Sequence, residues 1–398
     1  MEQIYLDHAA TTFVESRVLE AMLPYISEVY ANPSSFHSAG LQAKKAVDGA
    51  RNSIARILNC RDHEVLFTSG GTESDNLAVI GIIRANKEKG RHVITSAIEH
   101  PAVLEPLKFL EKNGEIELTI LSVDKHGLID PKDLAAALRA DTILVSIIYA
   151  NNEIGTIQLI ADIGREILKW RKQNKTALPY FHTDACQAAG ACELDVEKLH
   201  VDTMTLNGSK IYGPKGVGLL YLRKGVNLEP LVRGGGQERG LRSGTENVPG
   251  IVGLAKALEI AQSEKEDENA RLFVLRDRLI QGLLTIPKTR LNGHVAERLP
   301  NNVNISFMDT EGEAAVLYLD AQGIYVSTGS ACASKSLEPS YVITALGLPY
   351  EAAHGAIRFT LGKKTSAADI ERVIEVVPGV IEKLRTMSPL KLNMKNYT

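Results

Sequence analysis

The 398-residue sequence is poor in cysteine and in aromatic residues, and it has no strong excess of charge of one sign. The four cysteines, Cys60, Cys186, Cys192 and Cys332, show no metal-ligand pairing and are too few for a disulfide framework in a chain this long. We therefore expect no metal and a reducing, cytoplasmic location. A net charge of -3 without a long basic run argues against direct binding of nucleic acid.

Long apolar runs are also missing from the sequence. No stretch approaches the roughly 18–20 apolar residues that cross a bilayer, so we expect no membrane association. The first residues, Met1 to Tyr5, have neither the basic start nor the apolar run of a signal peptide. The apolar fraction of 44% is ordinary for a globular protein, and the length exceeds what one compact core usually holds. Two domains are therefore expected.

Short β-branched runs alternate with amphipathic stretches through most of the chain, which is typical of a mostly parallel sheet covered by helices. We expect strands at 64–68, 92–96, 117–121, 142–148, 180–183, 203–206 and 218–222, with helices at 73–86, 102–110, 134–139 and 161–170. A long charged helical pattern over 248–284 then connects to a smaller α+β domain. There we expect strands at 302–307 and 357–361 and helices at 313–319 and 367–384.

Two polar segments follow predicted strands of the larger part. The first, Thr68 to Ser74, contains Gly70 and Gly71 and opens a helix, which suits a phosphate because helix N-termini offer free N–H groups. An ordinary turn with Thr72 as N-cap is the alternative. The second places Asp184 at a strand end, where open α/β sheets bind ligands and where an acid can hold a ring nitrogen protonated. A capping aspartate is the alternative.

A lysine and a cysteine are the candidate nucleophiles. Lys210 lies on a glycine-flanked turn after another strand, and a buried lysine has a lowered pKa suited to Schiff-base chemistry. Lys215 competes for that role, although its Pro214 and Gly216 neighbours suggest a surface turn. Cys332 lies in a run of small residues, which fits an accessible thiol better than a buried one.

The order of these motifs resembles the aspartate-aminotransferase-like (fold type I) pyridoxal-phosphate enzymes. Further segments narrow the resemblance to cysteine desulfurases of the NifS/IscS type, within the class-V aminotransferases. These segments are Leu6–Thr12, Asn32–His37, Asn151–Gly155, Gly234–Thr245, and Gly329–Cys332 followed by Ser336–Ser340. The likeness runs from Tyr5 to about Pro389. It implies a large cofactor-binding domain at 16–260 with a mostly parallel seven-stranded sheet. It also implies a small α+β domain at 261–398 that carries the cysteine loop and is joined by residues 1–15.

The resemblance also implies a role for each matching residue. Lys210 would bind pyridoxal phosphate and move the substrate's α-proton, and Cys332 would take the sulfur of L-cysteine as a persulfide, leaving alanine. His100 would stack on the ring and assist proton transfer, Asp184 would pair with the ring nitrogen, and Arg358 would grip the substrate carboxylate. Further cofactor contacts would come from Gly71, Thr72, Asn152, Gln187 and Ser209, with Asn152 also beside the substrate, and from Thr245 of a neighbouring subunit in a homodimer.

The sequence departs from the family where Ser209 precedes Lys210, because many members have a histidine there. The sulfur would go to an iron–sulfur scaffold protein, and tRNA thiolation is a second use. A selenocysteine lyase or another lyase or aminotransferase of this fold is the alternative activity, and it would not need Cys332. A non-catalytic scaffold is a third alternative, against which the joint presence of Lys210, Asp184, His100, Arg358 and Cys332 argues.

Overall fold

The computed structural model describes residues 3–329, 339–389 and 392. Its largest sheet has seven strands in the order β2-β8-β7-β6-β5-β3-β4, and only β8 runs antiparallel to its neighbours. This confirms the mostly parallel seven-stranded sheet predicted from the sequence. The strands are β2 (Val65–Thr68), β3 (His92–Ser96), β4 (Glu117–Leu121), β5 (Thr142–Ser146), β6 (Tyr180–Asp184), β7 (Thr203–Asn207) and β8 (Gly218–Leu222).

Helices cover both faces of this sheet, so its central strands β3, β5 and β6 are buried along their whole length, including their His, Thr, Ser and Asp residues. One buried apolar cluster joins the sheet to α3, α7 and α9, and another joins it to α4 and α5. The helices of this part are α1 (Ser16–Met22), α2 (Pro24–Ser27), α3 (Ser38–Leu58), α4 (Gly71–Asn86), α5 (Pro101–Lys112), α6 (Pro131–Ala137), α7 (Ile160–Asn174), α8 (Val196–Leu199) and α9 (Val248–Ser263).

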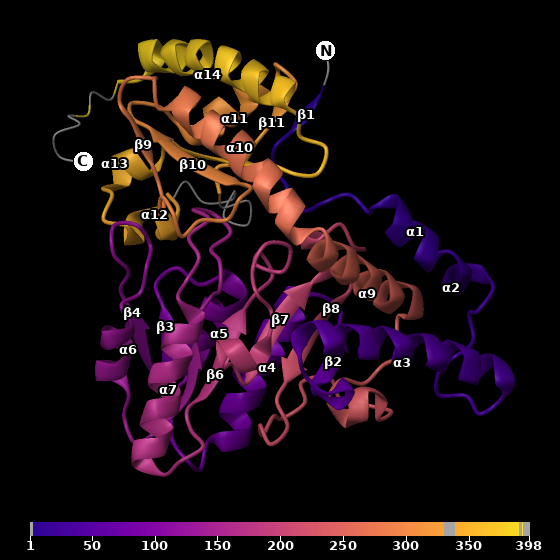
Figure 1. Cartoon of the computed structure of the whole chain (residues 1–398). Helices are drawn as coiled ribbons and strands as arrows, with labels where there is room; N and C mark the ends of the chain where they lie inside the picture. Colours follow the sequence, from indigo (N-terminus) through magenta and orange to yellow (C-terminus); the bar gives the residue numbers. More distant parts are fainter. Residues whose placement is uncertain (1–2, 330–338, 390–391, 393–398) are drawn as a thin grey trace.

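A smaller group of strands and helices lies beyond this part, at the top of Figure 1. Its three-stranded antiparallel sheet has the order β12-β10-β9, and β1 near the N-terminus pairs in parallel with β11. A separate buried cluster joins these strands to α10, α11 and α14. The elements are β1 (Ile4–Tyr5), β9 (Thr289–Leu291), β10 (Asn302–Phe307), β11 (Ile324–Tyr325), β12 (Ala356–Thr360), α10 (Lys265–Leu283), α11 (Gly312–Asp320), α12 (Tyr341–Ala345), α13 (Tyr350–Ala353) and α14 (Ala367–Met387).

The helical connection is two helices, where the sequence pattern predicted one. Helix α9 ends at Ser263 and α10 begins at Lys265, because the backbone of Glu264 leaves the helical conformation at φ -99° and ψ 1°. The Glu264 side chain accepts from Arg17 and Lys363, both at 2.7 Å. Acidic residues in the first turn of α10 favour a new helix start, since they face the positive end of its dipole. Among the described residues, no helix is both long enough and apolar enough to span a membrane.

Candidate active site

A cavity of about 280 Å³ lies at the carboxyl ends of the parallel strands, where open α/β sheets bind their ligands. Loops that follow β2, β3, β5, β6 and β7 all reach it, and the N-terminal segment and β12 close it from the other side. It brings together most of the residues expected from the sequence. Those that line it are Gly71, Thr72, His100, Asn152, Asp184, Gln187, Lys210 and Arg358.

Lys210 reaches the cavity from the short turn that follows β7. Its Nζ donates to the backbone oxygens of Ala9 at 2.8 Å and Ala10 at 2.6 Å. Burial lowers the pKa of Lys210, so more of its amine is neutral than in water. The competing candidate, Lys215, is exposed, donates to the Thr12 oxygen at 3.3 Å and does not line the cavity. Lys210 is thus the lysine whose surroundings suit covalent chemistry.

Three acid–base groups meet on one side of the cavity: Asp75, His100 and Asp184 each have a side-chain O or N atom within 4.8 Å of the others. Burial, with the nearby Asp184 carboxylate, raises the pKa of Asp75 well above its usual value. The protonated form of Asp75 is therefore favoured, which reduces the repulsion between the two carboxyl groups. Asp75 was not predicted from the sequence. The sequence feature that pointed to it is the i, i+3 spacing from Thr72, which puts both side chains on one face of α4.

His100 caps a helix and also lines the cavity. It is the N-cap of α5, where its Nδ1 accepts from the Ala102 N–H at 3.1 Å, and it also lines the cavity. Burial lowers the pKa of His100, so the neutral ring is favoured. Because Nδ1 accepts a hydrogen bond, the single proton of the neutral ring belongs on Nε2, which is then a donor.

Arg358 is a buried side chain of β12 and not the surface arginine that a strand end can carry. Its side chain is 3% exposed and forms an ion pair with Asp7 at 2.7 Å. Its second amine donates to the backbone oxygens of Asn152 at 3.0 Å and Gly329 at 3.2 Å. Its Nε has no partner among the described residues. Arg358 lines the cavity, and a planar guanidinium is suited to a carboxylate.

The glycine-rich turn after β2 forms an anion cradle at the start of α4. The first N–H groups of a helix have no partner within it and point outward. A Cβ on Gly71 would lie 2.8 Å from the Cys186 Sγ, so only glycine fits there. Thr72 is exposed and lies beside Gly71 on the cavity wall. Gln187 donates to the Ala9 oxygen at 2.9 Å, next to the Lys210 amine.

Two further expected residues, Ser209 and Thr245, do not line the cavity. The Ser209 hydroxyl lies 3.3 Å from the Asn207 Oδ1, and Thr245 is exposed on the segment between β8 and α9. Cys332, the expected nucleophile, lies outside the described residues. Within them, Cys60, Cys186 and Cys192 are free thiols, and burial raises the pKa of each. Those three thiols are therefore poor nucleophiles.

A fully buried carboxyl group beside His100 leads to a pH-dependent prediction. Burial raises the pKa of Glu99 to about 8, and its Oε2 has no partner among the described residues. A raised carboxyl pKa means that the folded state binds more protons than the unfolded state between about pH 4.5 and 8. Glu99 therefore lowers stability as pH rises through that window.

We expect the Glu99→Gln variant to avoid this loss. Its melting temperature relative to wild type should rise between pH 5 and pH 9, by the equivalent of about 2–5 kcal/mol of unfolding free energy. Thermal melts across that range measure the difference. A variant whose relative melting temperature stays constant from pH 5 to 9 would show that Glu99 is ionised throughout.

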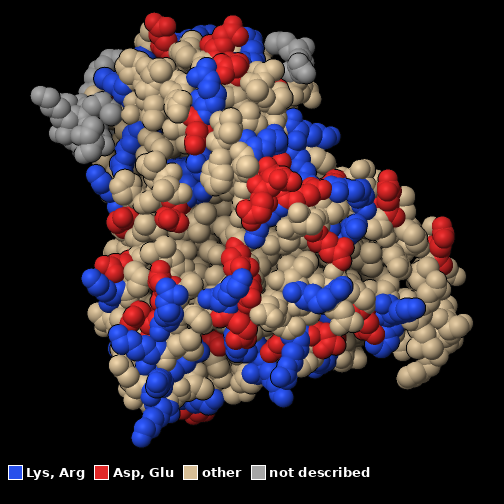
Figure 2. All heavy atoms as spheres, in the orientation of Figure 1, with Lys and Arg blue, Asp and Glu red and all other residues tan. Residues whose placement is uncertain are grey.

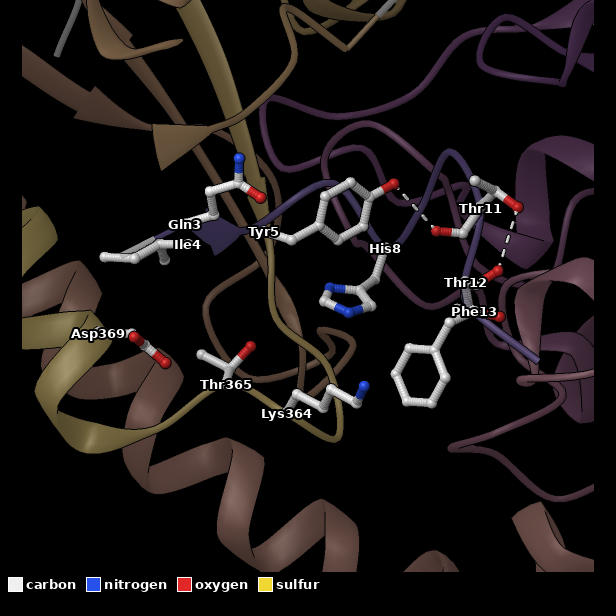
Figure 3. A pocket seen from close by; sticks show the side chains of 10 residues that line it. All are labelled: Gln3, Ile4, Tyr5, His8, Thr11, Thr12, Phe13, Lys364, Thr365 and Asp369. Carbon is white, nitrogen blue, oxygen red and sulfur yellow. Dashed lines mark hydrogen bonds between the residues drawn. The ribbon is translucent and has the colours of Figure 1, made fainter. Parts of the chain in front are cut away.

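A second cavity, of about 360 Å³, is larger but lacks a comparable set of reactive groups. Figure 3 shows it between the N-terminal segment and the start of α14, with the Phe13 ring, the Tyr5 ring and Lys364 around it. The charged groups in its lining are Lys364 and Asp369, and the Lys364 amine lies 4.3 Å from the centre of the Phe13 ring. The smaller cavity is therefore the candidate active site.

Comparison with known proteins agrees with this site. Residues 4–373 match the family model described as aminotransferase class-V. Cysteine desulfurase IscS of Methanosarcina thermophila is 55% identical over 97% of this chain and 94% of its own length. Cysteine desulfurase IscS 1 of Archaeoglobus fulgidus is 50% identical over 97% of this chain and 99% of its own.

Solved structures show the same likeness. A structure titled as a NifS-like protein superposes with a TM-score of 0.89 at 38% identity, covering 96% of this chain and all of that one. Another, titled SspA in complex with cysteine, gives a TM-score of 0.77 at 35% identity over 90% of this chain and 98% of its own. With its active-site lysine, acid and arginine in one cavity, the chain belongs to the class-V aminotransferase family, among the cysteine desulfurases.

Proposed function

We propose that this protein removes sulfur from L-cysteine, releases L-alanine and holds the sulfur as a persulfide on Cys332. The observation that carries the proposal is the shared cavity of Lys210, Asp184 and Arg358. A neutral amine and an acid are the groups that a pyridoxal cofactor needs, and a buried guanidinium is the group that an amino-acid carboxylate needs. The names of the full-length relatives support L-cysteine as the amino acid.

The side chains of the cavity fit pyridoxal phosphate. Lys210 would hold its aldehyde carbon, Asp184 its ring nitrogen, and the start of α4 with Gly71 and Thr72 its phosphate. The steric limit at Gly71 is consistent with a bound group, because a side chain there would fill the cradle. When bound, the cofactor supplies the electron sink that weakens bonds around the substrate's α-carbon.

The protein's own groups orient the substrate and move its protons. The Arg358 guanidinium lines the cavity and would bind the substrate carboxylate, which fixes the α-carbon there. The Lys210 amine, held by the Ala9 and Ala10 oxygens, takes the α-proton, and burial favours the neutral amine by lowering its pKa. The Nε2–H of His100 is available as a second proton donor.

The sulfur transfer balances without an outside oxidant or reductant. The Cys332 thiolate attacks the substrate sulfur, a sulfur–sulfur bond forms and the bond from sulfur to the β-carbon breaks. That carbon keeps the electron pair and then takes a proton, which gives alanine. A covalent intermediate of this kind divides one difficult step into two easier ones.

Replacing Cys332 tests this role. We expect wild-type protein to release alanine and, with a reductant, sulfide from L-cysteine. The Cys332→Ala variant should release neither while keeping the yellow colour of its bound cofactor. Cys60→Ala is the control and should retain wild-type rates, because that thiol lies away from the cavity. Alanine release by Cys332→Ala at the wild-type rate would instead favour the selenocysteine lyase alternative.

We further propose a homodimer in which Thr245 binds the cofactor phosphate of the partner subunit. Its exposure within this chain supports that role. Large apolar side chains of α1, α2 and the start of α3 are also exposed, and so are Tyr30 at 80% and Phe36 at 97% in the loop between α2 and α3. Figure 2 shows few charged residues over the projecting end at lower right, where Figure 1 places the start of α3. Exposed apolar surface of this kind typically marks an interface. A molar mass of one chain by light scattering at micromolar concentration would contradict the dimer.

The sulfur acceptor follows from the same proposal. A persulfide is a donor of sulfur to other thiols, and we propose an iron–sulfur scaffold protein as acceptor, with thiolated tRNA as a second destination. The cytoplasmic location stays a prediction of the sequence. Transfer of radioactive sulfur from L-[³⁵S]cysteine to a purified scaffold protein tests the acceptor, and retention of the label on this chain would contradict it.

A further inference from the structure

Glu153 occupies a fixed position between the two sheets, on the loop that follows β5. The Asn151 side chain accepts from the backbone N–H groups of Glu153 at 2.8 Å and Ile154 at 2.9 Å, which sets the turn. The Glu153 backbone oxygen accepts from the side-chain amides of Asn302 at 3.2 Å and Asn304 at 3.1 Å on β10. These bonds anchor Glu153 to both parts of the chain.

The chain meets the Glu153 carboxyl group just before segment 330–338. Gly329 has φ +100°, and a Cβ on it would lie 2.9 Å from the Glu153 Oε2. The Gly329 N–H donates to the Ser327 Oγ at 3.2 Å, and its oxygen accepts from Arg358 at 3.2 Å. Residue 329 is therefore packed against the carboxyl group and bonded on both sides of its own backbone.

The chain meets the same carboxyl oxygen just after that segment. Ser340 is the N-cap of α12, and its Oγ accepts from the N–H groups of Val342 at 3.1 Å and Ile343 at 3.3 Å. The same hydroxyl donates to the Glu153 Oε2. A hydroxyl has one proton, so Glu153 accepts the only hydrogen bond that the Ser340 hydroxyl can donate. Glu153 is buried and lines the active-site cavity.

We propose that Glu153 is a positioning residue that fixes where the chain enters and leaves segment 330–338. That segment contains Cys332, so the inference rests on the proposed role of that thiol. The Glu153 Oε2 lies against Gly329 and accepts from the Ser340 hydroxyl. This one buried oxygen therefore fixes the distance between Gly329 and Ser340. It does so at the edge of the cavity that Arg358 and Lys210 line. Misplacing a reacting group by about 1 Å can cost about 100-fold in rate.

A purely electrostatic role through Arg358 would give a different result. Burial raises the pKa of Glu153 and the nearby Arg358 guanidinium opposes that rise, so on this reading replacing Glu153 loosens the hold of Arg358 on the substrate carboxylate. In that case the KM for L-cysteine would rise while kcat stayed near wild type. A positioning role predicts the reverse, because substrate binding is retained and sulfur transfer slows.

The test compares the holoenzymes of Glu153→Gln, Ser340→Ala and the double variant. We expect each to keep its cofactor colour, to lower kcat for alanine release by about 10- to 100-fold, and to change KM less than about 2-fold. Single-turnover transfer of ³⁵S from L-[³⁵S]cysteine to Cys332 should slow by the same factor. The double variant should be no slower than the slower single variant, because the two residues act through one bond.

Two further variants separate positioning from loss of a helix cap. Ser340→Thr keeps the hydroxyl and should restore kcat to within about 3-fold of wild type. Ser366→Ala removes the N-cap of α14, far from the cavity, and should lower thermal stability without lowering kcat. Unchanged kcat in Glu153→Gln, additive effects in the double variant, or an equal loss in Ser366→Ala would overturn the inference. An active Cys332→Ala would instead overturn the proposed function.

Discussion

Alanine release by a Lys210→Ala variant is expected to fall by about 10²- to 10⁴-fold, the contribution of a positioned proton-transfer group. Among the described residues, Lys210 carries the one amine that lines the cavity, so the variant loses both the proposed covalent link to the cofactor and the proposed base for the α-proton. Initial rates of alanine release measure the loss of activity. Borohydride reduction followed by mass spectrometry measures the covalent link, since wild type should gain the cofactor mass on Lys210 and the variant should not.

Lys215→Ala is the matched control for this experiment. It removes an amine five residues away that is exposed and lies outside the cavity lining. We expect its rate to stay within about 2-fold of wild type, because an exposed side chain with one weak backbone contact contributes little. Cofactor mass recovered on Lys215, or a Lys215→Ala variant as slow as Lys210→Ala, would show that the amine has been assigned to the wrong lysine.

The Arg358→Lys variant is expected to lower kcat/KM for L-cysteine by about 10- to 100-fold. Lysine keeps the positive charge but loses the planar set of donors, and one hydrogen bond to a charged group contributes about 1.5–3 kcal/mol. The loss should fall on KM at least as strongly as on kcat, because the carboxylate is bound throughout the reaction. Steady-state kinetics at several L-cysteine concentrations give both values.

A surface arginine provides the comparison for Arg358. Arg278 on α10 forms a similar charged pair, with Glu371 at 2.6 Å, but its side chain is 48% exposed. Arg278→Lys should leave kcat and KM unchanged, since exposed ion pairs contribute little and this one is remote from the cavity. If Arg358→Lys also keeps the wild-type KM, the substrate carboxylate is bound by another group.

The sequence predicted the large sheet well, because its strands are short β-branched runs separated by turns. The predicted strand at 218–222 matches β8, and those at 92–96 and 117–121 match β3 and β4. The break at Glu264 was not predictable, since the helical pattern continues across it. Its cause is a tertiary contact with Arg17 and Lys363, which come from opposite ends of the chain.

The sequence predicted the candidate reactive residues of the cavity, but it did not predict the buried residues around them. Motifs that follow strands identified Lys210, Asp184 and His100, because the carboxyl ends of parallel strands meet at one edge. Asp75 was missed because one acidic residue in a helix resembles a solvated one, and only the fold shows that it is 1% exposed. Glu153 stood within a recognised motif, but its contacts with Gly329 and Ser340 depend on a partner nearly two hundred residues away.

The bond between Arg358 and Asp7 joins residues 351 positions apart. The ribosome delivers residue 7 early and residue 358 near the end of synthesis, so this pairing forms only when translation is almost complete. The seven strands of the large sheet, by contrast, are all available by residue 222. The strands that place the proposed cofactor cradle are therefore synthesised well before Arg358, the group proposed to bind the substrate carboxylate.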